Sequence, residues 1–117
     1  MSTLKVNTIQ NTSGTEMYLA KAWVNFNGTG TVAIRASGNV SSITDNGTGQ
    51  YTINFTNAMP DGNYAVVSEL SDPNTTNPTN GFGTLLYSTS TTSLRIHCGL
   101  YSSGYFDTPQ AHIAIFR

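Results

Sequence analysis

The chain reads Gln-Tyr-Thr-Ile-Asn-Phe-Thr at residues 50–56. In an extended conformation, Tyr51, Ile53 and Phe55 fall on one face, and the neutral polar residues between them fall on the other. Strict alternation of this kind is typical of a β-strand with one face buried and one face in water. We therefore expect an all-β fold. The alternation recurs at residues 22–26, 32–35, 94–98 and 113–116.

Clusters of turn-forming residues separate these segments. Asp-Asn-Gly-Thr-Gly at 45–49 lies directly before the 50–56 segment, so it predicts a hairpin with a preceding strand at 40–44. Pro-Asp-Gly at 60–62 predicts another tight turn. Short strands at this spacing predict an antiparallel β-sandwich, jelly-roll-like or a flattened barrel, of about eight or nine strands.

Some segments do not alternate. Residues 63–70 and 82–88 are more continuously apolar, which favours central strands that are covered on both faces. Residues 15–23 could form one or two helical turns. We expect residues 1–20 to be an N-terminal arm for attachment or for a trimer interface, and residues 21–117 to be the β-sandwich domain.

The composition excludes several classes of protein. The net charge is −1 and only 9% of residues are charged, whereas Thr, Ser and Asn supply 42 of the 117 residues. A chain without a basic excess lacks the electrostatic footprint of a nucleic-acid-binding protein. No apolar stretch is long enough for membrane insertion. The single cysteine excludes an intrachain disulfide, so oligomerisation is the common remaining way for a short chain to bury more surface.

Several segments have a recognisable sequence. They are Lys-Ala-Trp-Val-Asn-Phe at 21–26, Asn-Val-Ser-Ser-Ile-Thr at 39–44, and residues 51–60 with the following Asn63-Tyr64 pair. Together with the opening ten residues they resemble the C-terminal domain of bacteriophage tail-fibre and related small virion structural proteins, particularly from phages of marine bacteria and cyanobacteria. The resemblance covers over half of the chain. It implies a virion protein, usually a homotrimer, whose loops face host or partner surfaces.

On this resemblance we expect a non-enzymatic tail-fibre tip or adhesin, made in the bacterial host cytoplasm and carried on the virion. Its arm would contact other virion proteins, and its partner at the host would be a surface glycan or an outer-membrane protein. The candidate residues of the oligomer interface are Leu4, Val6, Ile9 and Trp23.

Other functions remain open. The same module could serve as a capsid decoration or head-fibre protein, or, in another class, as a small glycan-active hydrolase. Because the chain begins with Met1, we expect a whole small subunit rather than a carbohydrate-binding module from a larger enzyme.

Two loops contain the residue types that bind sugars, namely aromatic rings and neutral hydrogen-bonding side chains. The alternative for the aromatic residues is packing against the end of the sandwich or a neighbouring subunit, which is the commoner role of such residues. The alternative for the asparagine-rich loop is a solvated connection. The candidate ligand-binding residues are Tyr101, Tyr105, Phe106 and Asp107 in one loop, and Asn74, Asn77 and Asn80 in the other.

Metal binding and catalysis find little support in the sequence. His97 and Cys98 are adjacent on a predicted strand, so they point to opposite faces and do not easily share an ion. Cys98 continues an apolar face and is expected to be a small buried residue. Asp45 and Asp61 lie in turns, where an aspartate bonds to its own backbone. We expect no metal, no cofactor and no enzyme activity.

Overall fold

The computed structural model describes residues 1–71, 83–100 and 104–117. In these ranges the chain forms eleven β-strands and no helix, so the all-β prediction is confirmed. Nine of the strands belong to the two sheets of the sandwich, which agrees with the expected eight or nine. The strands are β1 (Ile9–Gln10), β2 (Glu16–Met17), β3 (Ala22–Asn27), β4 (Ala33–Gly38), β5 (Val40–Gly47), β6 (Gln50–Phe55), β7 (Ala65–Leu70), β8 (Gly83–Thr89), β9 (Ser93–Leu100), β10 (Gly104–Tyr105) and β11 (Ala111–Phe116).

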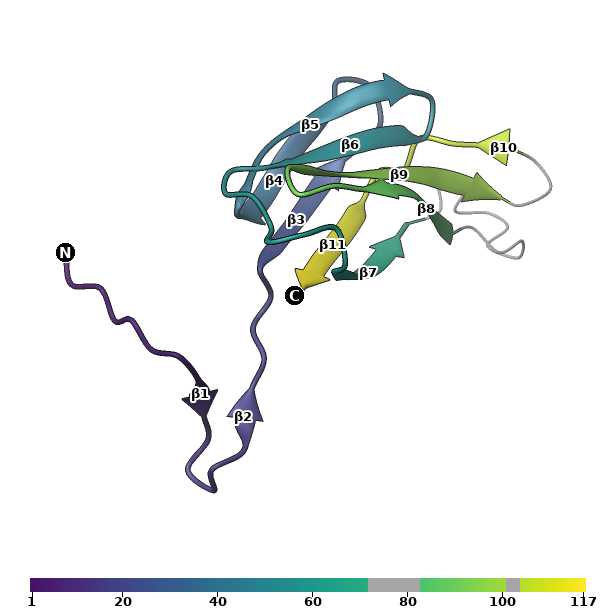
Figure 1. The fold of residues 1–117 in the computed structure, drawn as a ribbon. Helices are drawn as coiled ribbons and strands as arrows, with labels where there is room; N and C mark the ends of the chain where they lie inside the picture. Colours follow the sequence, from purple (N-terminus) through teal and green to yellow (C-terminus); the bar gives the residue numbers. More distant parts are fainter. Residues whose placement is uncertain (72–82, 101–103) are drawn as a thin grey trace.

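The strands form a two-layered antiparallel sandwich (Figure 1). The large sheet has the order β8-β9-β6-β5, with the short β10 pairing with the end of β9. The small sheet has the order β4-β3-β11-β7. The hairpin predicted around residues 45–49 is present, because β5 pairs with β6 and Gly47 lies opposite Gln50. β1 and β2 form a separate hairpin outside the sandwich.

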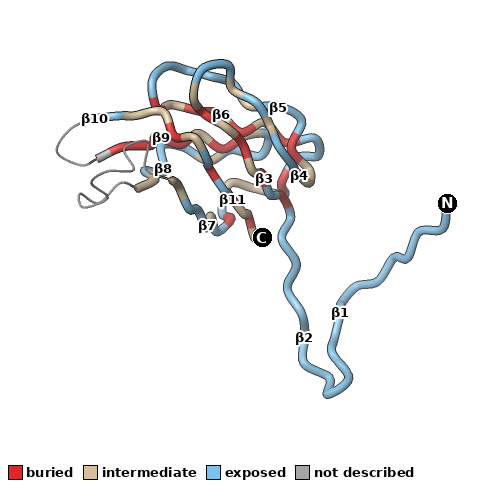
Figure 2. The backbone as a smooth tube through the Cα atoms, turned by 180° about the vertical axis from the view of Figure 1, so that it is seen from behind, coloured by how far each residue is buried: buried red, intermediate tan, exposed pale blue. Residues whose placement is uncertain are grey.

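The core lies between the inner faces of the two sheets (Figure 2). Along β3, β6 and β11 every second residue is buried, as the alternating sequence predicts. Phe26 of the small sheet meets Tyr51 of the large sheet edge to face, with ring centroids 5.2 Å apart. The inward-facing residues of the two sheets therefore form one apolar core, and the polar residues of the same strands face outward.

Two predictions about which strands are central in a sheet are wrong. Residues 63–70 and 82–88 do not form central strands: among the described residues, β7 pairs with β11 alone and β8 pairs with β9 alone. Both are edge strands in which Val67 and Leu86 are exposed. A continuous apolar run does not indicate whether another strand lies beside it, which depends on the rest of the fold. Phe82 lies outside the described residues.

The helical turn considered for residues 15–23 is also absent. This stretch contains β2 and the start of β3 instead. Residues 1–21 are exposed throughout, and they lead away from the sandwich in both views (Figures 1 and 2). The hairpin turn in this arm is held by Asn11, whose Oδ1 accepts hydrogen bonds from the backbone N–H groups of Ser13 and Thr15 at 3.0 Å. Local side-chain bonding of this kind favours a turn over a helix.

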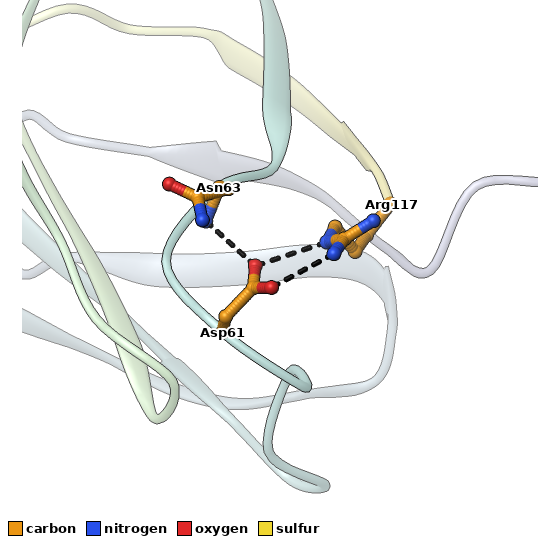
Figure 3. Close-up of polar contacts among 3 residues, drawn as sticks. All are labelled: Asp61, Asn63 and Arg117. Atoms are coloured by element: carbon orange, nitrogen blue, oxygen red, sulfur yellow. Dashed lines mark hydrogen bonds and ion pairs between the residues drawn. The ribbon is translucent and has the colours of Figure 1, made fainter.

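The C-terminal residue is fixed to the turn between β6 and β7 (Figure 3). Arg117 donates two hydrogen bonds to the carboxylate of Asp61, at 2.9 Å to Oδ1 and 2.7 Å to Oδ2. The backbone N–H of Asn63 also donates to Oδ1, at 2.8 Å. The hydrogen bonds from Arg117, followed by the one from Asn63, lower the pKa of Asp61 to about 2.

The lowered pKa predicts an acid-sensitive contribution to stability. A carboxylate with a lowered folded-state pKa stabilises the fold above its unfolded pKa, and this stabilisation is lost as the pH falls through the folded value. The wild-type protein should therefore resist urea better than Asp61→Asn at pH 7, and this advantage should fade between about pH 4 and pH 2. Because both side chains are partly exposed, 1 M salt should also reduce it.

Asp45→Asn is the matched control, because Asp45 accepts a backbone bond from Gly47 in a turn and has no arginine partner among the described residues. Urea unfolding of the three proteins at several pH values measures the effect. An acid-sensitive difference of the same size for Asp45→Asn would contradict the role given to Arg117.

Candidate functional site

Over β5, β6 and the start of β9, the outer face of the large sheet consists mainly of neutral polar residues. The strand register places Thr52 opposite Arg95 and Asn54 opposite Ser93 on this face. Asn54 donates hydrogen bonds to the hydroxyl groups of Ser42 and Thr44 on β5, at 3.1 and 2.9 Å. Among the described residues whose register places them on this face, Arg95 is the only charged one.

Three aromatic rings, from β8, β9 and β10, meet on the same face. The rings of Tyr87 and His97 are stacked, with centroids 4.6 Å apart and planes inclined by 28°. Tyr105 of β10 meets the same imidazole at 4.6 Å, with planes inclined by 64°. Tyr87 and Tyr105 are 61% and 42% exposed, whereas His97 between them is only 6% exposed. We call Tyr87, Arg95, His97 and Tyr105 the aromatic cluster.

A β-bulge brings Tyr87 into this cluster. The pairing of β8 with β9 shifts between Leu86 and Ser88, so Tyr87 is the extra residue opposite Arg95. Bulges change the direction of a side chain and are common near functional sites. Here the bulge lets the Tyr87 ring lie both against His97 and under the guanidinium of Arg95, whose Cζ is 4.7 Å from the ring centroid.

The polar atoms of the cluster are incompletely paired. Nη2 of Arg95 donates a long hydrogen bond of 3.3 Å to Oε1 of Gln50. Nε of Arg95 and Nε2 of His97 are buried and have no hydrogen-bond partner. Burial, and secondly the charge of Arg95, lower the pKa of His97, which favours the neutral form of its imidazole. Unpaired buried polar atoms are costly and call for an explanation.

The predicted ligand-binding residues have different surroundings. Tyr105 belongs to the aromatic cluster. Phe106 and Asp107 are half-buried, and Oδ1 of Asp107 accepts hydrogen bonds from the Tyr51 hydroxyl at 2.9 Å and from the Gly49 backbone at 2.8 Å. This bonding accounts for the aspartate without a ligand. The candidates outside the described residues are Tyr101, Asn74, Asn77 and Asn80.

The predicted interface residues are all exposed on the single chain. Leu4, Val6 and Ile9 lie in the arm. Trp23 lies on the outer face of the small sheet, 44% exposed, in one row with Ala114 and Val67. These positions are compatible with an interface, but the role of the four residues stays a prediction.

Cys98 points away from the aromatic cluster. It is fully buried in the core, as the sequence predicts, and burial raises the pKa of its thiol to about 12. His97, its neighbour, lies on the opposite face of β9. Within the described ranges, no three His, Cys, Asp or Glu side chains are grouped so that they could hold a metal ion.

Sequence reasoning missed Tyr87 and Arg95. The alternation of Arg95 and His97 against the apolar residues of β9 places both on the outer face, and this signal was available. Tyr87 could not be added to them from the sequence, because its position depends on the β8–β9 register and on the bulge.

Comparisons with family models, curated proteins and solved structures found no match to this chain. Nor does the part of the chain that the structure describes contain a helix long and apolar enough to cross a membrane.

Proposed function

We propose that the chain is a non-enzymatic structural subunit of a phage particle, of the tail-fibre tip or adhesin type, which contacts the host surface. The observation that carries the proposal is the arm. Residues 1–21 are all exposed, yet they include several large apolar side chains, and such side chains are normally covered in a stable particle. Those side chains are Leu4, Val6, Ile9, Met17, Tyr18 and Leu19.

The arrangement of the two ends supports the same proposal. The arm leaves the sandwich on the side away from β10 (Figure 1). The aromatic cluster lies at β10, because Tyr105 of that strand belongs to it. One end can therefore be attached to the particle while the other faces outward. Three of the five Asp and Glu side chains in the described residues have structural partners, which favours a binding role over a hydrolytic one: Asp45 accepts the Gly47 backbone N–H, Asp61 pairs with Arg117, and Asp107 bonds to Tyr51.

We propose further that the arm joins subunits into a homotrimer. The wild-type protein should then have the solution mass of three 12.5-kDa chains in size exclusion with light scattering. Combining Leu4→Ser, Val6→Ser and Ile9→Ser should yield a folded monomer, because these substitutions remove apolar surface from an interface and leave the core unchanged.

Lys5→Ser combined with Thr8→Ser is the matched control, because it changes the same arm without removing a large apolar side chain. A monomeric wild-type protein would contradict the trimer. On particles that carry the chain, gold-labelled antibodies against it should mark the tail. Labelling of the capsid instead would favour the decoration protein.

A further inference from the structure

The aromatic cluster has the features of a sugar-binding surface. Two exposed tyrosine rings, Tyr87 and Tyr105, flank a third ring that holds them in place. Sugars bind proteins by laying the apolar face of the ring on an aromatic side chain while hydrogen-bonding groups reach the hydroxyls. The hydroxyl and amide side chains of Thr52 and Asn54 continue along the same face and supply such groups.

Arg95 adds a positive charge to this surface, and this charge calls for a negatively charged ligand. Its guanidinium lies over the Tyr87 ring, so this contact helps to position the positive charge before any ligand arrives. Among the described residues it has no acidic partner, since the one ion pair there joins Arg117 to Asp61. Its Nε is unpaired and its Nη2 makes only the 3.3 Å contact with Gln50. Nε is buried, so the donors offered to a ligand are the terminal N–H groups of the guanidinium, whose paired geometry fits the two oxygens of a carboxylate.

Two carboxylates beside the large sheet, those of Asp45 and Asp107, do not oppose an anion on its outer face. Asp45 lies opposite Tyr51 in the register, which places it on the other side of the large sheet, and it bonds to the Gly47 backbone. Asp107 bonds to Tyr51 and Gly49. Among the described residues of this face, a negative ligand at Arg95 therefore meets one positive charge beside neutral polar and aromatic groups.

We infer that the aromatic cluster binds a carboxylate-bearing sugar, a uronic acid unit of a surface polysaccharide, with the sugar ring on the tyrosines and its carboxylate on Arg95. This inference rests on the proposed function and names the ligand class of the host-facing surface. A neutral sugar would leave Arg95 without a counter-charge, whereas a uronate provides both the ring and the anion. The carboxylate replaces Gln50 as the partner of Arg95.

The test is a calorimetric titration of the full-length protein with two probes, trigalacturonic acid and its methyl ester. The ester keeps the rings and hydroxyls but removes the charge. The acid should bind at least tenfold more tightly, and its affinity should fall with added salt. Equal affinities would overturn the acidic specificity, and no binding of either probe at millimolar concentration would overturn the sugar site.

Variants separate the two parts of the site. Arg95→Gln should bring the affinity for the acid down to that for the ester, whereas Tyr105→Ala should weaken both probes by a similar factor. Arg35→Gln is the control, because Arg35 is exposed and lies on the small sheet. Arg95→Lys keeps the charge without the paired N–H groups and should bind with intermediate affinity, which provides a second variant if Arg95→Gln does not fold.

An Arg95→Gln protein that folds and still prefers the acid would overturn the role of Arg95. The proposed function is judged separately. If the sugar titrations fail while the trimer and the labelling of the tail are found, the chain is a virion subunit with another ligand. If those two measurements fail while the uronate binds, the sugar site stands without the virion assignment.

Discussion

Replacing Gly49 by alanine should lower the free energy of unfolding by roughly 3–5 kcal/mol. Gly49 has a φ of +63°, a conformation that costs an L-residue about 1–2 kcal/mol. A Cβ there would lie 2.5 Å from the carbonyl oxygen of Cys98 and 2.7 Å from the backbone N and O of Phe106. These are backbone atoms, so two chain segments would have to move.

The hydrogen bonds of Gly49 explain why these two chain segments cannot move easily. The N–H of Gly49 donates to Asp107, and its carbonyl oxygen accepts the N–H of Cys98 at 2.7 Å. A shift that makes room for a methyl group would therefore stretch the hydrogen bonds that join the β5–β6 turn to β9 and to the segment after β10. Since a domain is stable by only about 5–15 kcal/mol, this single methyl group should remove a large fraction of the total.

Gly30→Ala is the matched control. Gly30 has a φ of +59° but no heavy atom within 4 Å of the position of a Cβ, so only the conformational cost of about 1–2 kcal/mol applies. Urea unfolding followed by tryptophan fluorescence measures both variants. Equal losses of stability for the two variants would show that close packing around Gly49 contributes nothing.

Gly49 also illustrates what the sequence can and cannot predict. Asp-Asn-Gly-Thr-Gly at 45–49 predicts the turn, because turn chemistry is local. Alternation likewise predicts the strands that become β3, β6, β9 and β11, because each buries one face. That Gly49 lies against Cys98 and Phe106 is a contact between distant segments, and no local pattern contains it.

The edge strands and the candidate site also depend on contacts between distant segments, so the sequence alone does not predict them. A continuous apolar run such as that of β8 is typical of a central strand, yet β9 is the one strand paired with β8 in the described part of the chain, and Leu85 is exposed. Tyr105 could be proposed as a ligand residue from its type alone. Its grouping with Tyr87 and His97 depends on which strands pair with β9 and in which register.

Removing the hydroxyl group of Tyr51 should be nearly as harmful as filling the space beside Gly49. Tyr51 is fully buried, and its hydroxyl lies 2.9 Å from both the carbonyl oxygen of Gly28 and Oδ1 of Asp107. Tyr51→Phe removes the hydroxyl donor from both acceptors, of which Asp107 keeps the Gly49 N–H, and it should cost roughly 2–3 kcal/mol because one of the acceptors is a carboxylate. Asp107→Ala should cost a similar amount, because it also removes the acceptor of the Gly49 N–H.

Because the two residues share one hydrogen bond, their effects should not add. The double variant should lose at least 1 kcal/mol less than the sum of the single losses, as expected for residues in direct contact. Tyr64→Phe is the matched control, because the Tyr64 hydroxyl lies 3.0 Å from two neutral carbonyl oxygens, those of Ser90 and Ser93. The stability lost in Tyr64→Phe should add to the stability lost in Asp107→Ala. Additivity for Tyr51 as well would contradict the coupling.

Alkaline unfolding tests the same hydrogen bond independently. Burial, and next the hydrogen bond with Asp107, raise the pKa of Tyr51 well above its ordinary value of 10.0. A raised folded-state pKa means that the folded protein holds this proton more tightly than the unfolded chain does. The resulting stabilisation is complete below about pH 10 and is lost as the pH rises further. Tyr51→Phe has no such proton, so between pH 9 and 11 it should lose less stability than the wild type. Parallel losses in the two proteins would mean that the Tyr51 proton does not contribute, and the coupling with Asp107 would then have to arise from packing alone.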